Sequence, residues 1–264
     1  MSTLLAISDL RVEYAIRRSD RGEVGGSGRR LRVIDGLSLE VAAGETLAVV
    51  GESGSGKSTL AETVVGLVRP VAGSIRFDGT ELANLSRRAG RRQRRRIQMV
   101  AQNPLLALSP RRRIATQIEE PLQVHTSLNR AQRATRVDEM LAALDLSSAV
   151  RRRFPHELSG GQAQRAVLAR ALILEPSLIL FDEPTSALDV SVQAGVLNLL
   201  RRLKVERNLT YLFITHDLAV ARHLADRVAV MRAGEIVEQR NTADLFGDPR
   251  HPYTRSLLAS CLTV

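Results

Sequence analysis

Gly51-Glu-Ser-Gly-Ser-Gly-Lys-Ser58 decides the fold of this chain, because it matches the pattern G-x-x-x-x-G-K-[ST]. In that pattern the backbone N–H groups of a glycine-rich loop surround a polyphosphate. The apolar run Leu47–Val50 predicts a buried strand before the loop, and Thr59–Val68 has apolar residues at helical spacing after it. A strand, a loop and a helix in this order predict a phosphate-binding loop, here called the P-loop. The alternative is a glycine-rich turn that binds nothing.

Each part of the P-loop has a distinct chemical role if a nucleotide binds there. Gly51, Gly54 and Gly56 allow positive φ and a close approach of the backbone to a ligand. The N-terminus of the following helix adds partial positive charge. Lys57 is expected to reach the outer phosphates, and the Ser58 hydroxyl is expected to help hold Mg²⁺.

The composition is ordinary for a soluble globular protein, with 264 residues, 44% hydrophobic and 25% charged. The formal net charge of +10 is compatible with nucleic acid, phosphates or an anionic membrane surface as partners. The single Cys261 excludes an internal disulfide and a cysteine-built metal cluster. The sequence indicates no signal peptide, and no apolar run approaches the roughly 20 residues that cross a bilayer. A role at a membrane would therefore need another chain to span it.

The order of predicted elements indicates an α/β fold. Leu4–Tyr14, Leu31–Val41 and Gly73–Gly79 read as strands of a small β-rich layer, and the polar segment Arg17–Arg30 reads as a loop. Further along, helical patterns alternate with apolar strands, which predicts a largely parallel sheet. The strands expected there are Ile97–Gln102, Ser177–Phe181 and Thr210–Thr215, followed by a hairpin of Arg227–Met231 and Glu235–Glu238. The helical stretches are Ile114–Leu146, Gln162–Leu174 and Val190–Val205. Asn129 and Ser159 are expected to be helix caps.

Polar residues stand where these predicted strands end. Ligands of parallel sheets bind at the carboxyl ends of strands, so one site is expected to gather Gln102, Asp182, Glu183 and His216 with the P-loop. Asp182 is suited to orient Mg²⁺ through water, and Glu183 to act as the base that activates a water. Both carboxylates could instead cap a helix, and a lone histidine at a strand end is more often structural.

The segment Arg87–Arg96 is the most basic run of the chain, with seven arginines. It reads either as a solvated helix face, or as a patch for nucleic acid or lipid headgroups. No aromatic residues are interleaved with the arginines, and aromatics are only 3% of the chain. Base stacking is therefore poorly supported, and the solvated or membrane-facing interpretation is favoured.

Leu158-Ser-Gly-Gly-Gln162 resembles the signature motif of ATP-binding cassette (ABC) proteins. It lies between the Gln102 strand and the Asp182 strand, where that family has it, and Ser186–Asp189 resembles the family's D-loop. The resemblance spans nearly the whole chain and implies ATP and Mg²⁺ as ligands. By this resemblance the site residues are Glu183, His216 and Gln102 for catalysis; Tyr14, Gly51, Glu52, Ser53, Gly54, Ser55, Gly56, Lys57, Ser58, Thr59, Ser159, Gly160, Gly161, Gln162 and Asp189 for the nucleotides; and Ser58, Gln102 and Asp182 for Mg²⁺.

The resemblance also implies an architecture and partners. The fold class expected is α/β, a P-loop NTPase core with a mainly parallel sheet, an N-terminal antiparallel β layer and a helical signature subdomain. The whole chain would be one nucleotide-binding domain, with about 1–102 and 165–245 as core, about 103–164 as helical subdomain and about 246–264 as a short tail. Two cassettes would close around two ATP molecules, each supplying Ser159–Gln162 to the nucleotide on its partner's P-loop.

Two further stretches, Asn103–Ile114 and His251–Leu258, resemble the peptide/nickel importer branch of this family, although Ala101 stands where that branch commonly has phenylalanine. The function implied is energy coupling for a bacterial importer of peptides or nickel chelates at the cytoplasmic face of the membrane. The implied partners are a second cassette, two permease subunits and an extracytoplasmic solute-binding protein, with no nucleic acid. The rival hypothesis is a soluble cassette ATPase acting on nucleic acid or ribosomes, which the positive charge would suit.

Overall fold

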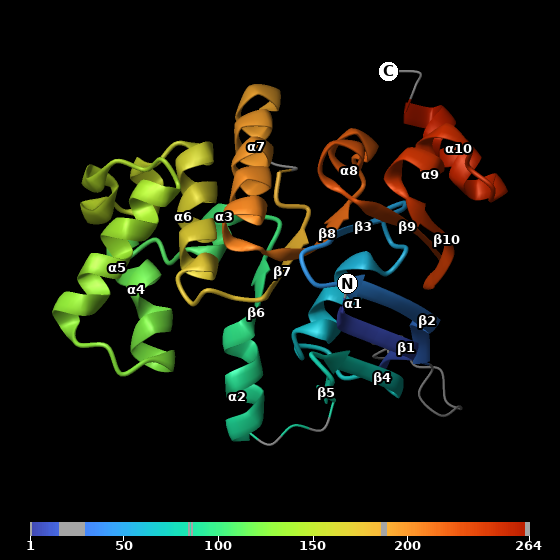
Figure 1. Ribbon diagram of the computed structural model, residues 1–264, viewed down its shortest axis with the longest axis horizontal. Helices are drawn as coiled ribbons and strands as arrows, with labels where there is room; N and C mark the ends of the chain where they lie inside the picture. The colour runs from blue at the N-terminus through green and yellow to red at the C-terminus, as the bar shows by residue number, and fades with distance from the viewer. Residues whose placement is uncertain (1, 16–29, 84, 86, 186–188, 262–264) are drawn as a thin grey trace, which may run out of the picture. The chain divides into compact units, whose positions relative to one another are not determined.

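The computed structural model describes residues 2–15, 30–83, 85, 87–185 and 189–261 (Figure 1). These residues form two compact units. The first unit comprises 1–43, 47–86 and 215–264, and the second comprises 44–46 and 87–214. The predicted loop 17–30 lies outside the described residues except for its last member, and so do residues 186–188 of the predicted D-loop.

The first unit contains an antiparallel sheet with the strand order β2-β1-β4-β5. Its strands are β1 (Thr3–Ala15), β2 (Arg30–Ala42), β4 (Ala72–Phe77) and β5 (Thr80–Glu81). Ile7 lies at the centre, paired with Leu39 on one side and Ile75 on the other, and all three side chains are buried. Alternation of apolar and polar residues therefore gives one buried face, and the predicted N-terminal β layer is confirmed.

A second set of strands in the first unit carries the P-loop. β3 (Thr46–Val50) pairs in parallel with β9 (Arg227–Arg232), which pairs antiparallel with β10 (Glu235–Asn241). The predicted hairpin is confirmed. The helices here are α1 (Lys57–Val64), α8 (Leu218–Leu224), α9 (Thr242–Gly247) and α10 (Pro252–Cys261). Side chains of β3 and β9 pack with Leu218, Leu245 and Tyr253 in one apolar cluster, so the two C-terminal helices are part of the core of this unit.

Helix α1 ends earlier than the apolar spacing of Thr59–Val68 predicts. The last helical residue is Val64, and Gly66 follows in the left-handed conformation with φ 79°. The N–H groups of Leu67 and Val68 then return to the carbonyl of Glu62. A glycine with positive φ after the last turn is a common helix stop, so the prediction of a ten-residue helix was wrong at its C-terminal end.

The second unit contains three parallel strands in the order β8-β7-β6. They are β6 (Ile97–Val100), β7 (Leu178–Asp182) and β8 (Thr210–Thr215). Phe181 of β7 contacts Tyr211 edge to face and Phe213 at a tilt, with ring centres 5.1 and 5.3 Å apart. Burial raises the pKa of Tyr211, whose hydroxyl donates to the Leu200 carbonyl at 3.1 Å. Since the strands on both sides of β7 run parallel to it, the mainly parallel sheet is confirmed.

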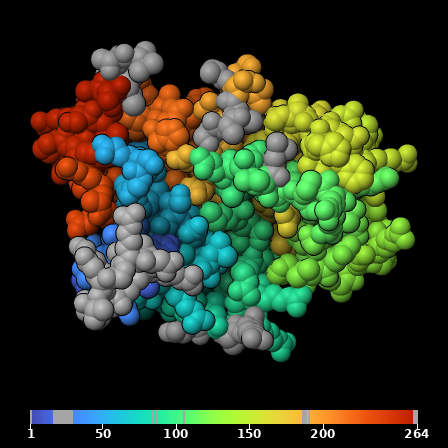
Figure 2. Space-filling model, turned by 180° about the vertical axis from the view of Figure 1, so that it is seen from behind, coloured from blue at the N-terminus to red at the C-terminus, as the bar shows by residue number. Residues whose placement is uncertain are grey.

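Helices make up the rest of the second unit. They are α2 (Arg87–Arg96), α3 (Pro104–Ala107), α4 (Ile114–His125), α5 (Arg130–Ala143), α6 (Gly160–Leu172) and α7 (Val190–Arg207), with short 3₁₀ turns at Ser148–Arg152 and Pro155–Glu157. The predicted helical stretch 114–146 is in fact two helices, because Asn129 forms a capping box with Gln132 and restarts the chain at α5. Helices α4 and α5 lie next to each other on the surface, coloured green in Figure 2.

Within the described residues, none of the helices combines the length and the apolarity that crossing a bilayer requires.

Candidate functional site

The P-loop has the conformation that its glycines permit. It connects the last residue of β3, Val50, to Lys57 at the start of α1, and Gly54 and Gly56 have φ of 82° and 105°. A Cβ on Gly51 would lie 2.1 Å from the Met231 carbonyl oxygen of β9. Only glycine fits at this first position, because β9 runs directly against the loop.

Lys57 is enclosed by the loop that precedes it. The side chain is 5% exposed, and its Nζ donates to the carbonyls of Gly51 at 2.8 Å and Glu52 at 2.7 Å, with Ser55 Oγ at 3.3 Å. A buried ammonium is costly unless it is hydrogen-bonded, and here the loop carbonyls supply the acceptors. The loop therefore curls around one positive charge at a helix N-terminus, an arrangement that fits a polyphosphate.

The P-loop also forms hydrogen bonds with the C-terminal helix and with the turn between β9 and β10. The backbone N–H of Glu52 donates to the Tyr253 hydroxyl at 3.2 Å, and the N–H of Gly234 donates to the Ser55 carbonyl at 3.0 Å. Tyr253 is 8% exposed, and the Arg232 guanidinium lies 4.9 Å from its ring centre. The sequence patterns did not predict this hydrogen bond between Glu52 and Tyr253. The stretch His251–Leu258 stood out by resemblance alone, and nothing in its spacing predicts a contact with residue 52.

A buried carboxylate fixes the start of α10. Glu238 of β10 accepts hydrogen bonds from the backbone N–H groups of Arg250 and His251, both at 2.9 Å. Burial alone would raise the pKa of Glu238, but these hydrogen bonds and the nearby Arg240 outweigh it, so the pKa lies below its usual value. His251 Nδ1 in turn accepts from the Tyr253 N–H at 3.1 Å. The chain from Glu238 to Tyr253 thus has a defined path toward the P-loop.

The other predicted site residues of the first unit are Thr59, which lies in α1, Tyr14 and His216. Tyr14 lies near the end of β1 and is 39% exposed. His216 follows the last residue of β8 and is exposed, and Asp217 caps α8 by accepting from the N–H groups of Ala219 at 2.8 Å and Val220 at 3.2 Å. His216 thus stands directly after the end of β8, as expected, and the Asp217 cap then starts α8, a helix that the sequence did not predict.

In the second unit the structure brings Gln102 and Glu183 together. Gln102 Nε2 donates to Glu183 Oε2 at 3.0 Å. Glu183 has φ 48°, and its N–H donates to the Ile214 carbonyl of β8 at 2.9 Å. Left-handed backbone at a non-glycine residue costs about 1–3 kcal/mol and persists where its surroundings hold it, often at functional sites. Asp182, half-buried, is the last residue of β7.

The segment Ser159–Gln162 forms the first turn of α6. Ser159 Oγ accepts from the Gln162 N–H at 3.3 Å, and Gln162 Oε1 accepts from the Ser159 N–H at 3.2 Å. The predicted cap is confirmed, and α6 begins at Gly160 rather than at Gln162. A Cβ on Gly161 would lie 2.7 Å from Val192 Cγ1 of α7, so the small residue lets these two helices approach. Asp189 stands at the N-cap position of α7 without a side-chain cap hydrogen bond.

The predicted site residues thus form two groups. The first unit holds Tyr14, Gly51–Ser58, Thr59 and His216; the second holds Gln102, Asp182, Glu183, Ser159–Gln162 and Asp189. Within the described residues, no three His, Cys, Asp or Glu side chains lie close enough to hold a metal ion together. The oxygens of Ser58 and Asp182 suit Mg²⁺, which prefers few protein ligands and shares its remaining positions with water and phosphate.

Comparison with known families finds one model that matches residues 34–186, described as ABC transporter. Curated relatives match over almost the whole chain. The oligopeptide transport ATP-binding protein AppF of Bacillus subtilis is 45% identical over 260 residues, which is 98% of this chain and 78% of AppF. The di/tripeptide transport ATP-binding protein DppF of Pseudomonas aeruginosa is also 45% identical, over 98% of this chain and 79% of DppF.

Solved structures share the fold. The cassette MJ0796, in a dimeric post-hydrolysis state bound to ADP and Pi, matches with TM-score 0.78 and 28% identity over 90% of this chain and 98% of that chain. CbiO1 from Clostridium perfringens, part of the ABC transporter complex cbiONQ, matches with TM-score 0.79 and 26% identity. That match covers 94% of this chain and 92% of cbiO1.

Proposed function

This chain belongs to the ABC transporter family, and on that premise we propose that it hydrolyses ATP to drive a bacterial peptide importer. The observation that carries the proposal is its similarity, over 98% of its length, to ATP-binding proteins of oligopeptide and di/tripeptide transport. Left-handed backbone at Gly54 and Gly56 of the P-loop and the hydrogen bond between Gln102 and Glu183 support it. The names of these relatives favour peptides over nickel as the cargo.

The proposed ATP site begins at the P-loop. N–H groups of Gly54–Ser58 bind the phosphates, and the ammonium of Lys57 exchanges its loop carbonyls for phosphate oxygens. Tyr14 stacks on the adenine. Mg²⁺ would be held by Ser58, Gln102 and Asp182, partly through water, and would neutralise charge between the outer phosphates.

Hydrolysis in this proposal is an in-line attack by water. The Glu183 carboxylate accepts a proton from the water while the oxygen of the water bonds to the γ-phosphorus. The bond between the γ-phosphorus and the bridging oxygen breaks, and ADP leaves with that oxygen. His216 donates a hydrogen bond to the γ-phosphate oxygens, where charge develops. Gln102, which donates to Glu183, orients the carboxylate and links its position to the residues that follow β6.

The proposed working unit is a pair of cassettes. Ser159, Gly160, Gly161 and Gln162 present the N-terminus of α6 to the nucleotide on the partner cassette, with Asp189 nearby in that interface. ATP binding would close the pair and hydrolysis would reopen it, which moves two permease subunits fed by a solute-binding protein. The residues 103–164 serve as the helical subdomain in this scheme. The chain would act at the cytoplasmic face of the membrane as a peripheral subunit.

Purification of the tagged chain from its native cells tests the proposal. We expect permease subunits and a homologous cassette to be recovered with it, and the purified assembly to hydrolyse ATP. Recovery with ribosomes or nucleic acid and without any membrane subunit would refute the transport role. That result would restore the rival function in nucleic-acid metabolism.

A further inference from the structure

Helix α2 (Arg87–Arg96) is a concentrated positive surface and contributes no residue to the proposed ATP site. It contains no acidic residue, and its exposed arginines are Arg88, Arg91, Arg92, Arg94 and Arg95. Arginine stays protonated at every physiological pH. Residues three and four apart share a face of a helix, so Arg88, Arg92 and Arg95 point to the same side. Side chains of like charge at this spacing repel, and an anionic partner would relieve that repulsion.

The end of α4 borders this positive face. Arg88, Arg91, Arg92 and Arg95 line a shallow pocket together with Val124, His125, Thr126 and Ser127. Arg91 donates to the Val124 carbonyl, which fixes α2 against α4. Burial lowers the pKa of His125, and the charges of Arg91, Arg95 and Arg94 lower it further. The histidine is therefore neutral at neutral pH, as expected where the local potential is strongly positive.

Acidic residues of α4 and of the neighbouring pockets are engaged by other arginines. Glu119 pairs with Arg133 at 2.7 Å, and Glu120 pairs with Arg112 at 2.8 Å and Arg170 at 3.5 Å.

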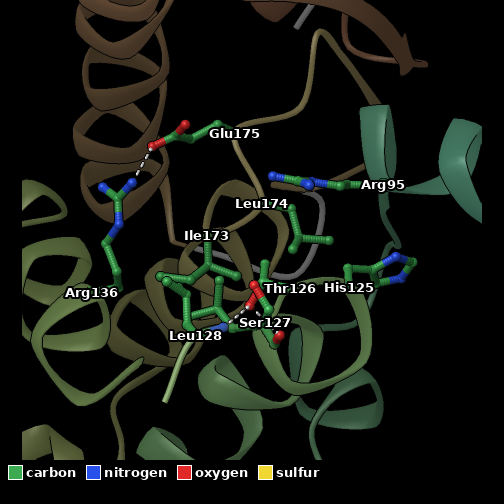
Figure 3. Close-up of a pocket in the computed structure, with 10 residues that line it drawn as sticks. Arg95, His125, Thr126, Ser127, Leu128, Arg136, Ile173, Leu174 and Glu175 are labelled. Carbon is green, nitrogen blue, oxygen red and sulfur yellow. Dashed lines mark hydrogen bonds and ion pairs between the residues drawn. The ribbon is translucent and has the colours of Figure 1, made fainter. Parts of the chain in front are cut away.

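Glu175 pairs with Arg136 at 3.3 Å. Figure 3 shows this ion pair on one side of the neighbouring pocket, and Arg95 and His125 on the other. Among the residues that the structure describes, the five exposed arginines of α2 have no carboxylate partner of their own. The surface therefore keeps its full charge.

We propose that this surface, formed by Arg88, Arg91, Arg92 and Arg95 with His125 at its border, binds the anionic phospholipid headgroups of a membrane. The charges are complementary, since phosphate groups pair well with guanidinium forks. The proposal rests on the proposed function only for the presence of a membrane beside the chain. Val124, 47% exposed among the arginines, offers an apolar contact at the headgroup level. The pocket has no Phe, Tyr or Trp among its lining residues, so a nucleic acid would find no large aromatic ring to stack on.

Vesicle binding by the purified full chain, without nucleotide or permease subunits, tests this directly. We expect the chain to co-sediment with phosphatidylcholine vesicles that contain about 30% phosphatidylglycerol, and not with phosphatidylcholine alone. Each arginine near an anionic surface strengthens binding about fivefold, so the variant Arg88→Gln/Arg92→Gln/Arg95→Gln should lower the partition coefficient about a hundredfold. Raising the salt to about 1 M should abolish binding, because the screening length falls to about 3 Å.

A matched control removes the same charge elsewhere. Arg69, Arg152 and Arg201 are exposed, and the variant with all three changed to Gln should bind vesicles nearly as well as the wild type. An equal loss in this control, or undiminished binding by the α2 variant, would overturn the proposal. So would a loss of binding to polyuridine by the α2 variant while its vesicle binding remained, because the surface would then serve RNA. ATP hydrolysis, assayed in solution without vesicles, reports separately on the proposed function, and unfolding curves confirm that both variants fold.

Discussion

Gln102 and Glu183 meet because β6 and β7 are paired in parallel register. Val100 lies opposite Phe181, so the residues two positions further on lie at the same edge of the sheet. There Gln102 Nε2 donates to Glu183 Oε2 at 3.0 Å. The hydrogen bond from the neutral amide orients the carboxylate. A base that must take a proton from water needs such an orientation.

Glu183→Gln should abolish turnover while ATP binding is retained. An amide of the same shape cannot accept the proton, and a positioned base contributes about 10²–10⁴ in rate. Single-turnover hydrolysis and equilibrium binding of ATP measure the two effects separately. Turnover at the wild-type rate would show that Glu183 is not the base.

Gln102→Ala should slow hydrolysis by about ten- to hundredfold, since a hydrogen bond to a charged group contributes about 1.5–3 kcal/mol. The affinity for ATP should change less than the rate constant of hydrolysis. Gln123→Ala serves as the control, because Gln123 donates to a carboxylate, Glu119, on the exposed side of α4. If both variants lose the same activity, the contact with Glu183 has no special role.

Tyr253→Phe should weaken ATP binding through the P-loop. The change removes the hydroxyl that accepts from the Glu52 N–H and keeps the buried ring. One such hydrogen bond contributes about 0.5–1.5 kcal/mol, so the Kd for ATP should rise about two- to tenfold.

Tyr211→Phe is the matched control for this prediction. It also removes one buried hydroxyl, which donates to the Leu200 carbonyl in the other unit. Both variants should lose some stability, but only Tyr253→Phe should raise the Kd for ATP. An unchanged Kd for ATP in Tyr253→Phe would show that the Tyr253 hydroxyl does not support ATP binding and that the side chain serves only in packing.

Glu238→Gln should destabilise the fold at neutral pH and have little effect in acid. The amide can accept only one of the two backbone hydrogen bonds, and a hydrogen bond to a charged group contributes about 1.5–3 kcal/mol. The folded pKa of Glu238 is lowered, so its stabilising effect is present above the unfolded pKa of about 4.3 and is lost as the pH falls through the folded value.

Denaturant unfolding at a series of pH values measures this difference. The wild type and Glu238→Gln should differ most near pH 7 and converge in strong acid. Glu235→Gln, at an exposed position of the same strand, should track the wild type throughout. A gap between the wild type and Glu238→Gln that persisted in acid would mean that the loss arises from packing, not from the ionised carboxylate.

Much of this fold was predictable because its strands are marked by strong local patterns. Val49, Leu180 and Phe213 belong to apolar runs that become fully or almost fully buried parallel strands. The cap at Asn129 was predicted, but the break that separates α4 from α5 was not. Helices α8 and α9 were not predicted, since short helices carry too few turns to show a period.

The candidate site, too, was predictable only in part. Motif spacing predicts which residues stand at strand ends, but the left-handed φ of Glu183 depends on the hydrogen bond of its N–H to Ile214, a contact across strands. The link from Tyr253 to Glu52 joins residues far apart in sequence and could not be seen in either stretch alone. Long-range contacts of this kind are set by packing, which no local pattern contains.

The most direct test of the central claim is ATP-driven uptake of a labelled oligopeptide into proteoliposomes. These proteoliposomes hold the chain together with its permease subunits and second cassette. With the wild-type chain we expect uptake that has two requirements. ATP must be present on the cassette side of the membrane, and the solute-binding protein must be present on the opposite side. With Glu183→Gln we expect no uptake, although the assembly forms and binds ATP. Equal uptake with Glu183→Gln, or none with the wild type across a panel of peptides, would contradict the account.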